Sequence, residues 1–347
     1  MKSIRTKLIL FIAAPTLIVY VAILGWTLSF LRARSFSELE TTMTRLASNF
    51  AGRFDGYLRE AAAVADTSAT AFAANLHGPE VGFYSQLRAN VEKRPFIYGA
   101  CAAFEPGTVR PTSELFAPYV HRSGAAIAEM NISRGVYDWY GDPRWTWYRE
   151  PKSLGRPVWS APYFDEGAGN VLMTTYSAPF FVDGSIAGVA TVDIDLTGLR
   201  ESIGTGITEG ADFVILAKDG AFVYDRRPER ILRKTLKDVA RESGNRELER
   251  ILPLVLAGKA GVAVVPGWDH PERQWLFYSP IASTDWTFIA FTPERIALEG
   301  VRLRFIAAAA ALAVTLAMIV TCIVLVSGLI VKPLSRLTAN PDFSPWG

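Results

Sequence analysis

The residues with the most chemical potential lie between positions 140 and 195. In the strand predicted at 189–196, Thr191, Asp193 and Asp195 point to one face and apolar side chains point to the other. A carboxylate inside a strand and backed by apolar neighbours is costly unless it has a partner. The face that carries Asp193 therefore either meets solvent or lines a polar pocket between the sheet and a helix.

A short helix is predicted to begin at residues 142–149, upstream of that strand. Asp142 is a suitable N-cap residue, and Pro143 suits the first helical position. Trp147 and Tyr148 follow in the same segment, as core aromatic residues or as the lining of a pocket. The sequence leaves both alternatives open.

Strands and tight turns surround this region. Residues 96–104 form a short apolar run, and the Asp-Gly pairs at 183–184 and 219–220 each separate two apolar runs, which is a strong signal for a hairpin. A third strand pair follows further along the chain. Two α+β modules in tandem, with a boundary near 204–210, would account for the repetition.

Two apolar runs without charge, 8–31 and 305–331, enclose this globular sequence. A bilayer core of ~30 Å is spanned by roughly 20 helical residues, so each run is long enough to cross it. Basic residues precede the first run and follow the second, which predicts that both ends are cytoplasmic, although Arg32 and Arg34 oppose this signal. A secretory signal is the alternative for the first run, but a small-x-small cleavage pattern is missing.

Apolar residues recur every three or four positions from 36 to 58, which predicts one apolar stripe on a long helix. The stripe could belong to a stalk that carries motion and pairs with a second copy of the chain. It could equally pack the helix against the outer domain. Gly52 and Gly56 argue against an uninterrupted coiled coil.

Composition and motifs exclude several functions. The formal net charge is +2, and basic clusters alternating with aromatic residues are missing, so nucleic-acid binding is not expected. Cys101 and Cys322 fall in the outer domain and the second apolar run, so a disulfide between them is not expected. His77, His121 and His270 are isolated, and metal-binding spacings, phosphate-binding glycine loops and nucleophile elbows are lacking. We therefore expect neither an enzyme nor a metal site or cofactor in this chain.

The segments 142–149, 157–165 and 188–196, with the Asp-Gly hairpin before the last, resemble the extracytoplasmic double-Cache (dCache) sensor domain of bacterial receptors. The resemblance covers about 32–302. It implies an α+β fold, in which a long N-terminal helix precedes two PAS-like modules and the membrane-distal module binds a small ligand. The segment 331–337 is similar to the start of a HAMP helix.

The resemblance and the apolar runs together predict the organisation of the chain. The predicted parts are a cytoplasmic N-terminus at 1–7, a transmembrane helix at 8–31, an outer domain at 32–302, a second transmembrane helix at 305–331 and a truncated HAMP-like start at 332–347. The outer domain divides into a long helix at 33–75, a distal module at about 76–204 and a proximal module at about 205–300. The implied setting is the bacterial inner membrane, with a homodimer as the assembly.

Receptors of this kind carry several downstream modules. The resemblance allows a PPM-type serine phosphatase, a histidine kinase, a diguanylate cyclase or a chemotaxis signalling rod. The amino-acid sequence of residues 157–179 is most similar to that of the phosphatase group. None of these modules is present in this sequence.

The amino-acid-binding branch of this family uses a spaced set of Tyr, Arg, Trp-Tyr, Asp and Asp. This chain matches five of the positions and carries Trp145 where the arginine grips the ligand carboxylate, and Arg144 lies about 100° away on a helix. Aromatic faces attract ammonium groups by about 0.5–2 kcal/mol each, and a carboxylate supplies the counter-charge. The predicted ligand is therefore an amine, a quaternary ammonium compound or an amino-acid-like compound. The predicted ligand-binding residues are Tyr140, Trp145, Trp147, Tyr148, Asp165 and Asp193.

Asp165 precedes a turn-rich string at 166–170, so an ordinary turn carboxylate is the alternative to a ligand anchor. For the whole chain, two classes of function remain. One is a ligand-gated transmembrane sensor, and the other is a membrane-anchored scaffold that binds another protein. A polar cavity lined by the predicted residues would favour the sensor, whereas a solid core with a large apolar surface patch would favour the scaffold.

Overall fold

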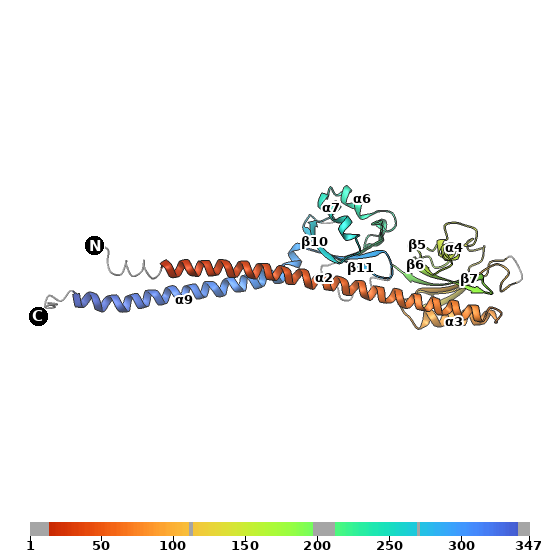
Figure 1. Cartoon of the computed structure of the whole chain (residues 1–347), viewed down its shortest axis with the longest axis horizontal. Coiled ribbons are helices and arrows are strands. Elements are labelled where there is room, and N and C mark those ends of the chain that lie inside the picture. The colour runs from red at the N-terminus through yellow and green to blue at the C-terminus, as the bar shows by residue number, and fades with distance from the viewer. Residues whose placement is uncertain (1–13, 111–113, 197–211, 269–270, 339–347) are drawn as a thin grey trace. The chain divides into compact units, whose positions relative to one another are not determined.

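The computed structural model describes residues 14–110, 114–196, 212–268 and 271–338 (Figure 1). The chain divides into two units, one of Met1–Thr42 with Glu294–Gly347 and one of Met43–Pro293. The predicted cytoplasmic N-terminus at 1–7, the module boundary at 204–210 and the end of the HAMP-like segment lie outside the described residues.

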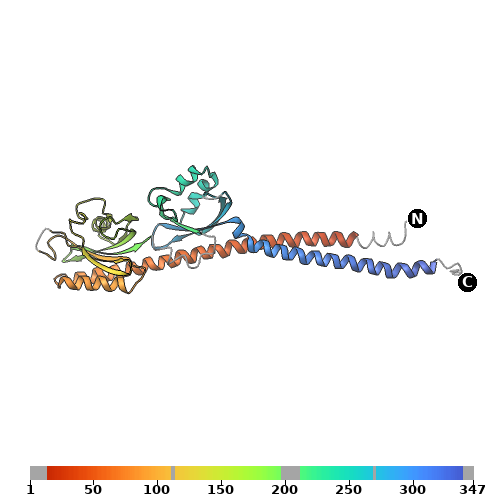
Figure 2. The ribbon, with the colours of Figure 1, turned by 180° about the vertical axis from the view of Figure 1, so that it is seen from behind.

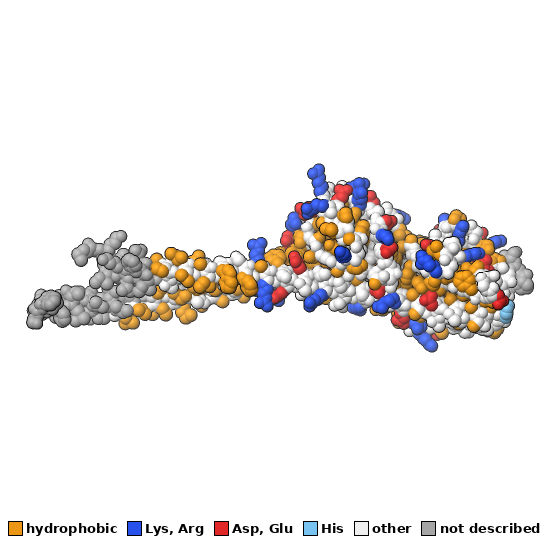
Figure 3. All heavy atoms as spheres, in the orientation of Figure 1, with side chains coloured by type: hydrophobic (Ala, Val, Ile, Leu, Met, Phe, Trp, Pro, Cys, Tyr) orange, Lys and Arg blue, Asp and Glu red, His pale blue; other side chains and the backbone are white. Residues whose placement is uncertain are grey.

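The first unit contains two long apolar helices. Helix α2 (Ala14–Ala74) continues without a break from the first apolar run into the predicted stalk, and α9 (Glu299–Thr338) follows the short helix α8 (Glu294–Ala297). Both contain apolar windows long enough to cross a membrane, and neither window is buried. Figure 3 shows hydrophobic side chains covering these stretches. Contacts between the described parts of the helices include those from the Tyr20 hydroxyl to the Leu312 carbonyl and from Arg304 to Glu38 at 3.5 Å.

The second unit contains an antiparallel sheet of seven strands, which we call the distal sheet. Its order is β3-β2-β1-β7-β6-β4, and β5 also pairs with β6. The hairpin predicted at Asp183-Gly184 is confirmed, because Val182 pairs with Ser185 and both turn residues have positive φ. The strands are β1 (Gly99–Phe104), β2 (Pro118–Ser123), β3 (Ala126–Asn131), β4 (Val158–Trp159), β5 (Tyr163–Phe164), β6 (Leu172–Val182) and β7 (Ser185–Asp195).

The two faces of the distal sheet have different coverings (Figures 1 and 2). On one face, Phe72 of α2 and Phe83 of α3 (Glu80–Glu92) contact Phe104. On the other, α4 (Thr146–Leu154) and its flanking loops bury an aromatic cluster against Cys101 and Ala103. Successive β1 side chains point to opposite faces, so this short strand serves both layers.

The predicted start of α4 is wrong. Asp142 accepts hydrogen bonds from the backbone N–H of Arg144 at 2.9 Å and from the Arg144 guanidinium, which form a local turn. This side-chain turn competes with helix formation, so Pro143 lies in the turn and the helix begins at Thr146 with Trp145 as its N-cap. Gly155, in the left-handed region with φ 61°, ends it.

A second antiparallel sheet, the proximal sheet, has the order β10-β11-β12-β8-β9. Alternate residues of β12 face α2 and the α6–α7 pair, because Phe288 stacks on Phe50 whereas Ile289 joins the core beneath α6 and α7. The strands are β8 (Asp212–Leu216), β9 (Phe222–Tyr224), β10 (Gly261–Pro266), β11 (Arg273–Ile281) and β12 (Trp286–Pro293), and the helices are η3 (Pro228–Arg230), α6 (Leu236–Glu242) and α7 (Arg246–Val255). The predicted α+β class, with a long N-terminal helix before two sheets, is confirmed.

Phe54 tests the packing of α2 on the proximal sheet. Its side chain is 0% exposed and stacks on Trp286 with ring centroids 6.3 Å apart. Phe54→Ala is expected to lower the free energy of unfolding by about 3–5 kcal/mol, because a buried ring is replaced by a cavity. Chemical unfolding monitored by tryptophan fluorescence measures the change. Arg53→Ala, on the exposed side of the same helix, is the control, and equal losses in the two variants would contradict this packing.

Candidate ligand-binding site

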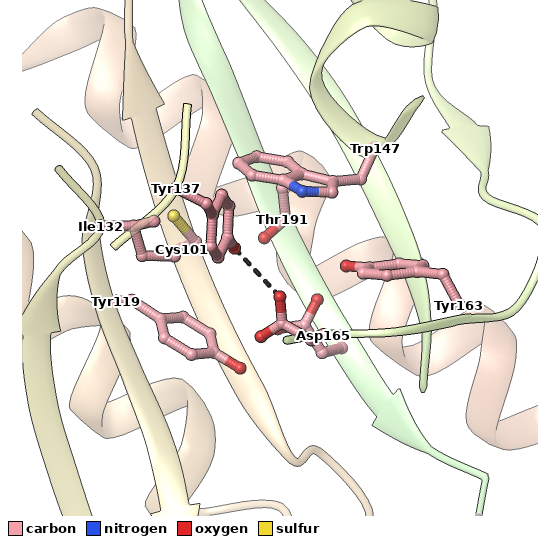
Figure 4. Close-up of a pocket in the computed structure, with 9 residues that line it drawn as sticks. Cys101, Tyr119, Ile132, Tyr137, Trp147, Tyr163, Asp165 and Thr191 are labelled. Atoms are coloured by element: carbon pink, nitrogen blue, oxygen red, sulfur yellow. Dashed lines mark hydrogen bonds between the residues drawn. The ribbon is translucent and has the colours of Figure 1, made fainter. Parts of the chain in front are cut away.

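The face of the distal sheet beneath α4 holds a small cavity (Figure 4). Strands β1, β2 and β7 contribute to its lining, together with α4, the loop before it and the β5–β6 loop. The space open to the centre of a water-sized sphere is about 10 Å³, which corresponds to about one water molecule. The lining residues are Cys101, Tyr119, Ile132, Tyr137, Trp147, Tyr163, Asp165, Thr191 and Asp193.

The register of β1, β2 and β7 places the residues on the sheet side of the cavity next to one another. Cys101 pairs with Thr191 on β7 and with Tyr119 on β2, so the three side chains project to the same face. Asp193 pairs with Gly99, two residues further along each strand. A Cβ atom at Gly99 would lie 2.5 Å from the Tyr119 hydroxyl oxygen, so only glycine leaves room for the tyrosine ring.

Asp193 is a buried carboxylate with few hydrogen-bond donors. Its side chain accepts a hydrogen bond from Thr175 Oγ1 at 2.7 Å. Because this bond uses the threonine proton, the Tyr163 hydroxyl donates to Thr175 at 2.8 Å. The Tyr119 hydroxyl faces the same carboxylate without a well-formed hydrogen bond. Burial, with a contribution from the charge of Asp165, raises the pKa of Asp193 to about 7, although the Thr175 and Tyr119 hydroxyls oppose the rise.

Asp165 reaches the cavity from the loop between β5 and β6 and is 2% exposed. Its carboxylate accepts hydrogen bonds from the backbone N–H of Gly169 at 2.7 Å and from the Tyr137 hydroxyl at 3.0 Å. The Tyr98 hydroxyl holds the same loop by donating to the Gly169 carbonyl at 2.8 Å. Burial raises the pKa of Asp165, although its two donors oppose this. Asp165 thus both organises a turn and lines the cavity, and its role as a ligand anchor stays a prediction.

The cavity contains two carboxyl groups, and the chain places neither lysine nor arginine among its described lining residues. The charge of His121 acts to lower the pKa of Asp165, and the His121 ring stacks on Tyr119 with centroids 5.0 Å apart. Burial raises the pKa of the Cys101 thiol, and of the Tyr119, Tyr137 and Tyr163 hydroxyls, so these groups stay neutral near pH 7. Within the described part of the chain, no cluster of three His, Cys, Asp or Glu side chains is placed to hold a metal ion.

Three of the predicted ligand-binding residues, Trp147, Asp165 and Asp193, line this cavity together. The Trp147 ring nitrogen is buried without a hydrogen-bond partner among the described residues. Trp145 lies behind the wall, stacked on Tyr137 with ring centroids 4.0 Å apart. The adjacent Arg144 is exposed and paired with Asp142, so it does not take the place of the family's arginine.

Tyr140 and Tyr148 instead belong to a neighbouring cluster with Glu105 and Lys152, which we call the Lys152 cage. Both tyrosine hydroxyls donate to the Glu105 carboxylate, with the Tyr140 bond at 3.2 Å. The Lys152 ammonium lies 2.5 Å from Glu105 Oε1 and 4.6 Å from the centre of the Tyr140 ring. The two tyrosines therefore already hold a cation that the chain itself supplies, and their contact with a ligand stays a prediction.

Several of the residues that line the cavity were not predicted from the sequence. Strand alternation could have placed Tyr119 on the face of Cys101, because both lie in strands of the same sheet. Tyr163 lies in the motif at 157–165, yet its inward direction depends on a two-residue strand. Tyr137 and Ile132 lie in loops, where periodicity gives no direction.

The raised pKa of Asp193 makes stability depend on pH. The folded protein keeps a proton on Asp193 up to about pH 7, whereas the unfolded chain releases it near the ordinary value of 3.8. Stability is therefore lost as pH rises between these values, by about 2–3 kcal/mol from pH 5 to pH 8. Asp193→Asn should remove this loss in urea unfolding measured at both pH values. Asp183→Asn, in the exposed hairpin turn, is the control, and identical pH profiles for wild type and Asp193→Asn would contradict the assignment.

Comparison with known proteins places the fold. Residues 83–201 match the methyl-accepting chemotaxis protein-like, first PDC sensor domain. The methyl-accepting chemotaxis protein TlpQ of Pseudomonas aeruginosa is 28% identical over 200 residues. That match covers 50% of this chain and 28% of TlpQ, so the chain spans under a third of the relative's length.

Solved structures share the same architecture. The extracellular domain of soHK1S-Z6, a protein named as a histidine kinase, is 26% identical with a TM-score of 0.66, over 78% of this chain and 98% of that one. The ligand-binding domain of the Pseudomonas aeruginosa amino acid chemoreceptor PctB, in complex with L-Arg, is 16% identical with a TM-score of 0.54, over 75% and 97%. Together with the two sheets on one long helix, these matches show that the globular part of the chain has the fold of dCache sensor domains, and that residues 83–201 are similar to the first PDC sensor domain of chemotaxis-protein-like receptors.

Proposed function

We propose that this chain is the sensor part of a transmembrane signalling receptor whose distal cavity binds a small cationic amine. One observation carries the proposal. Asp165 and Asp193 are both buried in one cavity, and neither lysine nor arginine lies among its described lining residues. Buried carboxylates without a cation are costly, so the cavity favours a ligand that brings positive charge.

The rest of the lining supports an ammonium ligand. Rings of Tyr119, Tyr137, Tyr163 and Trp147 lie around the Asp165 carboxylate in Figure 4, and aromatic faces attract ammonium groups. The α-carboxylate of an amino acid would need a guanidinium or a similar donor, and Trp145 stands where the family has its arginine. PctB, which shares the fold, was solved with L-Arg, so an amino acid is the alternative that a binding experiment has to distinguish.

Ligand entry requires the lining to move, because the cavity has room for about one water molecule. The β5–β6 loop and α4 are the parts of the lining that do not belong to the sheet, whereas β1, β2 and β7 are hydrogen-bonded within it. Binding would therefore displace the loop of Asp165 or the helix of Trp147. Such a displacement is the kind of local event that a sensor converts into a signal.

The remaining parts of the proposal concern the membrane. Helices α2 and α9 would cross the bacterial inner membrane with the sensor domain outside and both termini inside, and a homodimer would be the signalling unit. Helix α9 continues to Thr338 and so includes the segment similar to the start of a HAMP helix. A HAMP relay would then pass the signal to a cytoplasmic effector.

The alternative function, a protein-binding scaffold, is less well supported. It predicts a solid core with a large apolar surface patch. The core beneath α4 contains a polar cavity instead. Exposed large apolar side chains of the globular unit, such as Val81, Leu154 and Leu254, come from different helices.

Asp193→Asn tests the counter-charge. Removing the charge is expected to weaken amine binding by about 2–5 kcal/mol if the pair is buried. Isothermal titration calorimetry with propylamine, choline and α-amino acids gives the affinities, and Asp183→Asn on the same hairpin is the matched control. Tight binding of an ordinary α-amino acid by the wild type, or unchanged amine affinity in Asp193→Asn, would contradict the proposed ligand class.

Amine affinity should also depend on pH. Asp193 has a pKa of about 7, so below pH 7 the empty cavity holds a proton that the ammonium must displace. Affinity is expected to fall by up to about tenfold for each pH unit below 7 and to level off above it. Titrations between pH 5.5 and pH 8.5, in two buffers with different ionisation enthalpies, measure the affinity and the released proton. Affinity that stays constant below pH 7, without proton release, would contradict the displacement.

A further inference from the structure

We propose that the Lys152 cage is a second ammonium-binding site, in which the chain's own Lys152 is the resident cation and fixes α4 over the distal cavity. This inference goes beyond the proposed function, because it concerns a different set of side chains. It also does not require that the distal cavity bind an amine.

The cage has the components of an ammonium site. The Glu105 carboxylate supplies a charge partner at 2.5 Å, and the Tyr140 and Tyr148 rings lie 4.6 Å and 5.5 Å from the Lys152 ammonium. Lys152 Nζ also lies 3.5 Å from the Tyr140 hydroxyl. Both tyrosine hydroxyls are held by Glu105, so the rings keep their positions independently of the lysine. Such a cage recognises any primary ammonium of the right size.

The parts of the cage come from different elements of the distal module. Glu105 follows β1, and its backbone N–H donates to the Ala187 carbonyl at 2.9 Å, which fixes it to the sheet. Tyr148 and Lys152 are one turn apart on α4 and so share a face of the helix. The ammonium therefore ties α4 to the end of β1.

The tie also affects the cavity. Trp147, which precedes Tyr148 on α4, lines the cavity. Trp139 contacts both of these residues, with ring centroids 6.0 Å from Trp147 and 4.5 Å from Tyr148. A rotation of α4 that released Lys152 would move Trp147 as well. Glu105 and Lys152 are thus positioning residues for the wall of the cavity.

The cage can be emptied and refilled. Lys152→Ala removes the side chain beyond Cβ, and n-propylammonium has the same atoms as the removed part. The variant is expected to bind n-propylammonium at one site more than the wild type, as measured by calorimetry on the full chain in lipid nanodiscs. Any binding to the wild type reports on the distal cavity, and only the added site reports on the cage.

The position of α4 gives a second measurement. Hydrogen exchange at the amides of α4 is expected to become roughly tenfold faster in Lys152→Ala and to return toward the wild-type rate with n-propylammonium. The neutral 1-propanol should fail to restore it. Lys152→Met, which keeps the aliphatic stem, should exchange faster without gaining the new site.

Two controls separate the cage from general effects. Glu105→Gln combined with Lys152→Ala should abolish the added site, because the charge partner is lost. Lys218→Ala removes an exposed lysine paired with Asp285 at 3.0 Å and should gain no site. The proposal is overturned if Lys152→Ala binds no more n-propylammonium than the wild type, or if adding Glu105→Gln to Lys152→Ala leaves the added site intact. It is also overturned if 1-propanol restores the hydrogen-exchange rate of α4 as well as n-propylammonium does.

Discussion

The burial of two carboxylates in one cavity is the constraint on which the distal module depends. Asp193 is held in the middle of the sheet by β7, and Asp165 is carried on a loop closed by the backbone of Gly169. Hydroxyl groups surround them, yet hydroxyls offset only part of the cost of desolvation. A proton offsets the rest of this cost, and in the proposed function a cationic ligand would do the same, so the predicted pH dependence and the proposed ligand preference have the same origin.

The same aromatic segment contributes to two sites, the distal cavity and the Lys152 cage. Trp147 faces the cavity without an internal cation, whereas the next residue, Tyr148, faces a carboxylate that already holds Lys152. Adjacent residues on a helix lie about 100° apart, so one short helix can line both sites. A tethered ammonium loses little entropy on binding, and it suits a structural tie. A free ligand loses translational and rotational entropy when it binds, so its occupancy depends on its concentration, which suits a sensor site.

The sequence supported the fold more fully than the site. Alternation along β7 placed Thr191 and Asp193 on one face of the strand, and the Asp-Gly pair located the β6–β7 hairpin, because both signals are local. Whether that face met solvent or a pocket was left open. The start of α4 was mispredicted since the Asp142 side chain forms a turn that propensities do not reveal. Tyr140 and Tyr148 matched a ligand-binding pattern, but their partner Glu105 is distant in sequence and adjacent only after folding. Contacts between distant segments decide which aromatic face is free, and periodicity carries no information about them.

The arrangement of the module limits where a ligand can act. Phe72 of α2 packs against Phe104 and Phe180 on one face of the distal sheet, and Phe54 of the same helix stacks on Trp286 of the proximal sheet. Close-packed aromatic layers of this kind resist displacement. The opposite face of the distal sheet is covered by a short helix and loops, which combine a buried aromatic cluster with polar contacts to Glu105 and Asp165. In the proposed receptor, a change caused by a ligand in the distal cavity would therefore begin in α4 or the β5–β6 loop, and the sheet lies between these elements and α2.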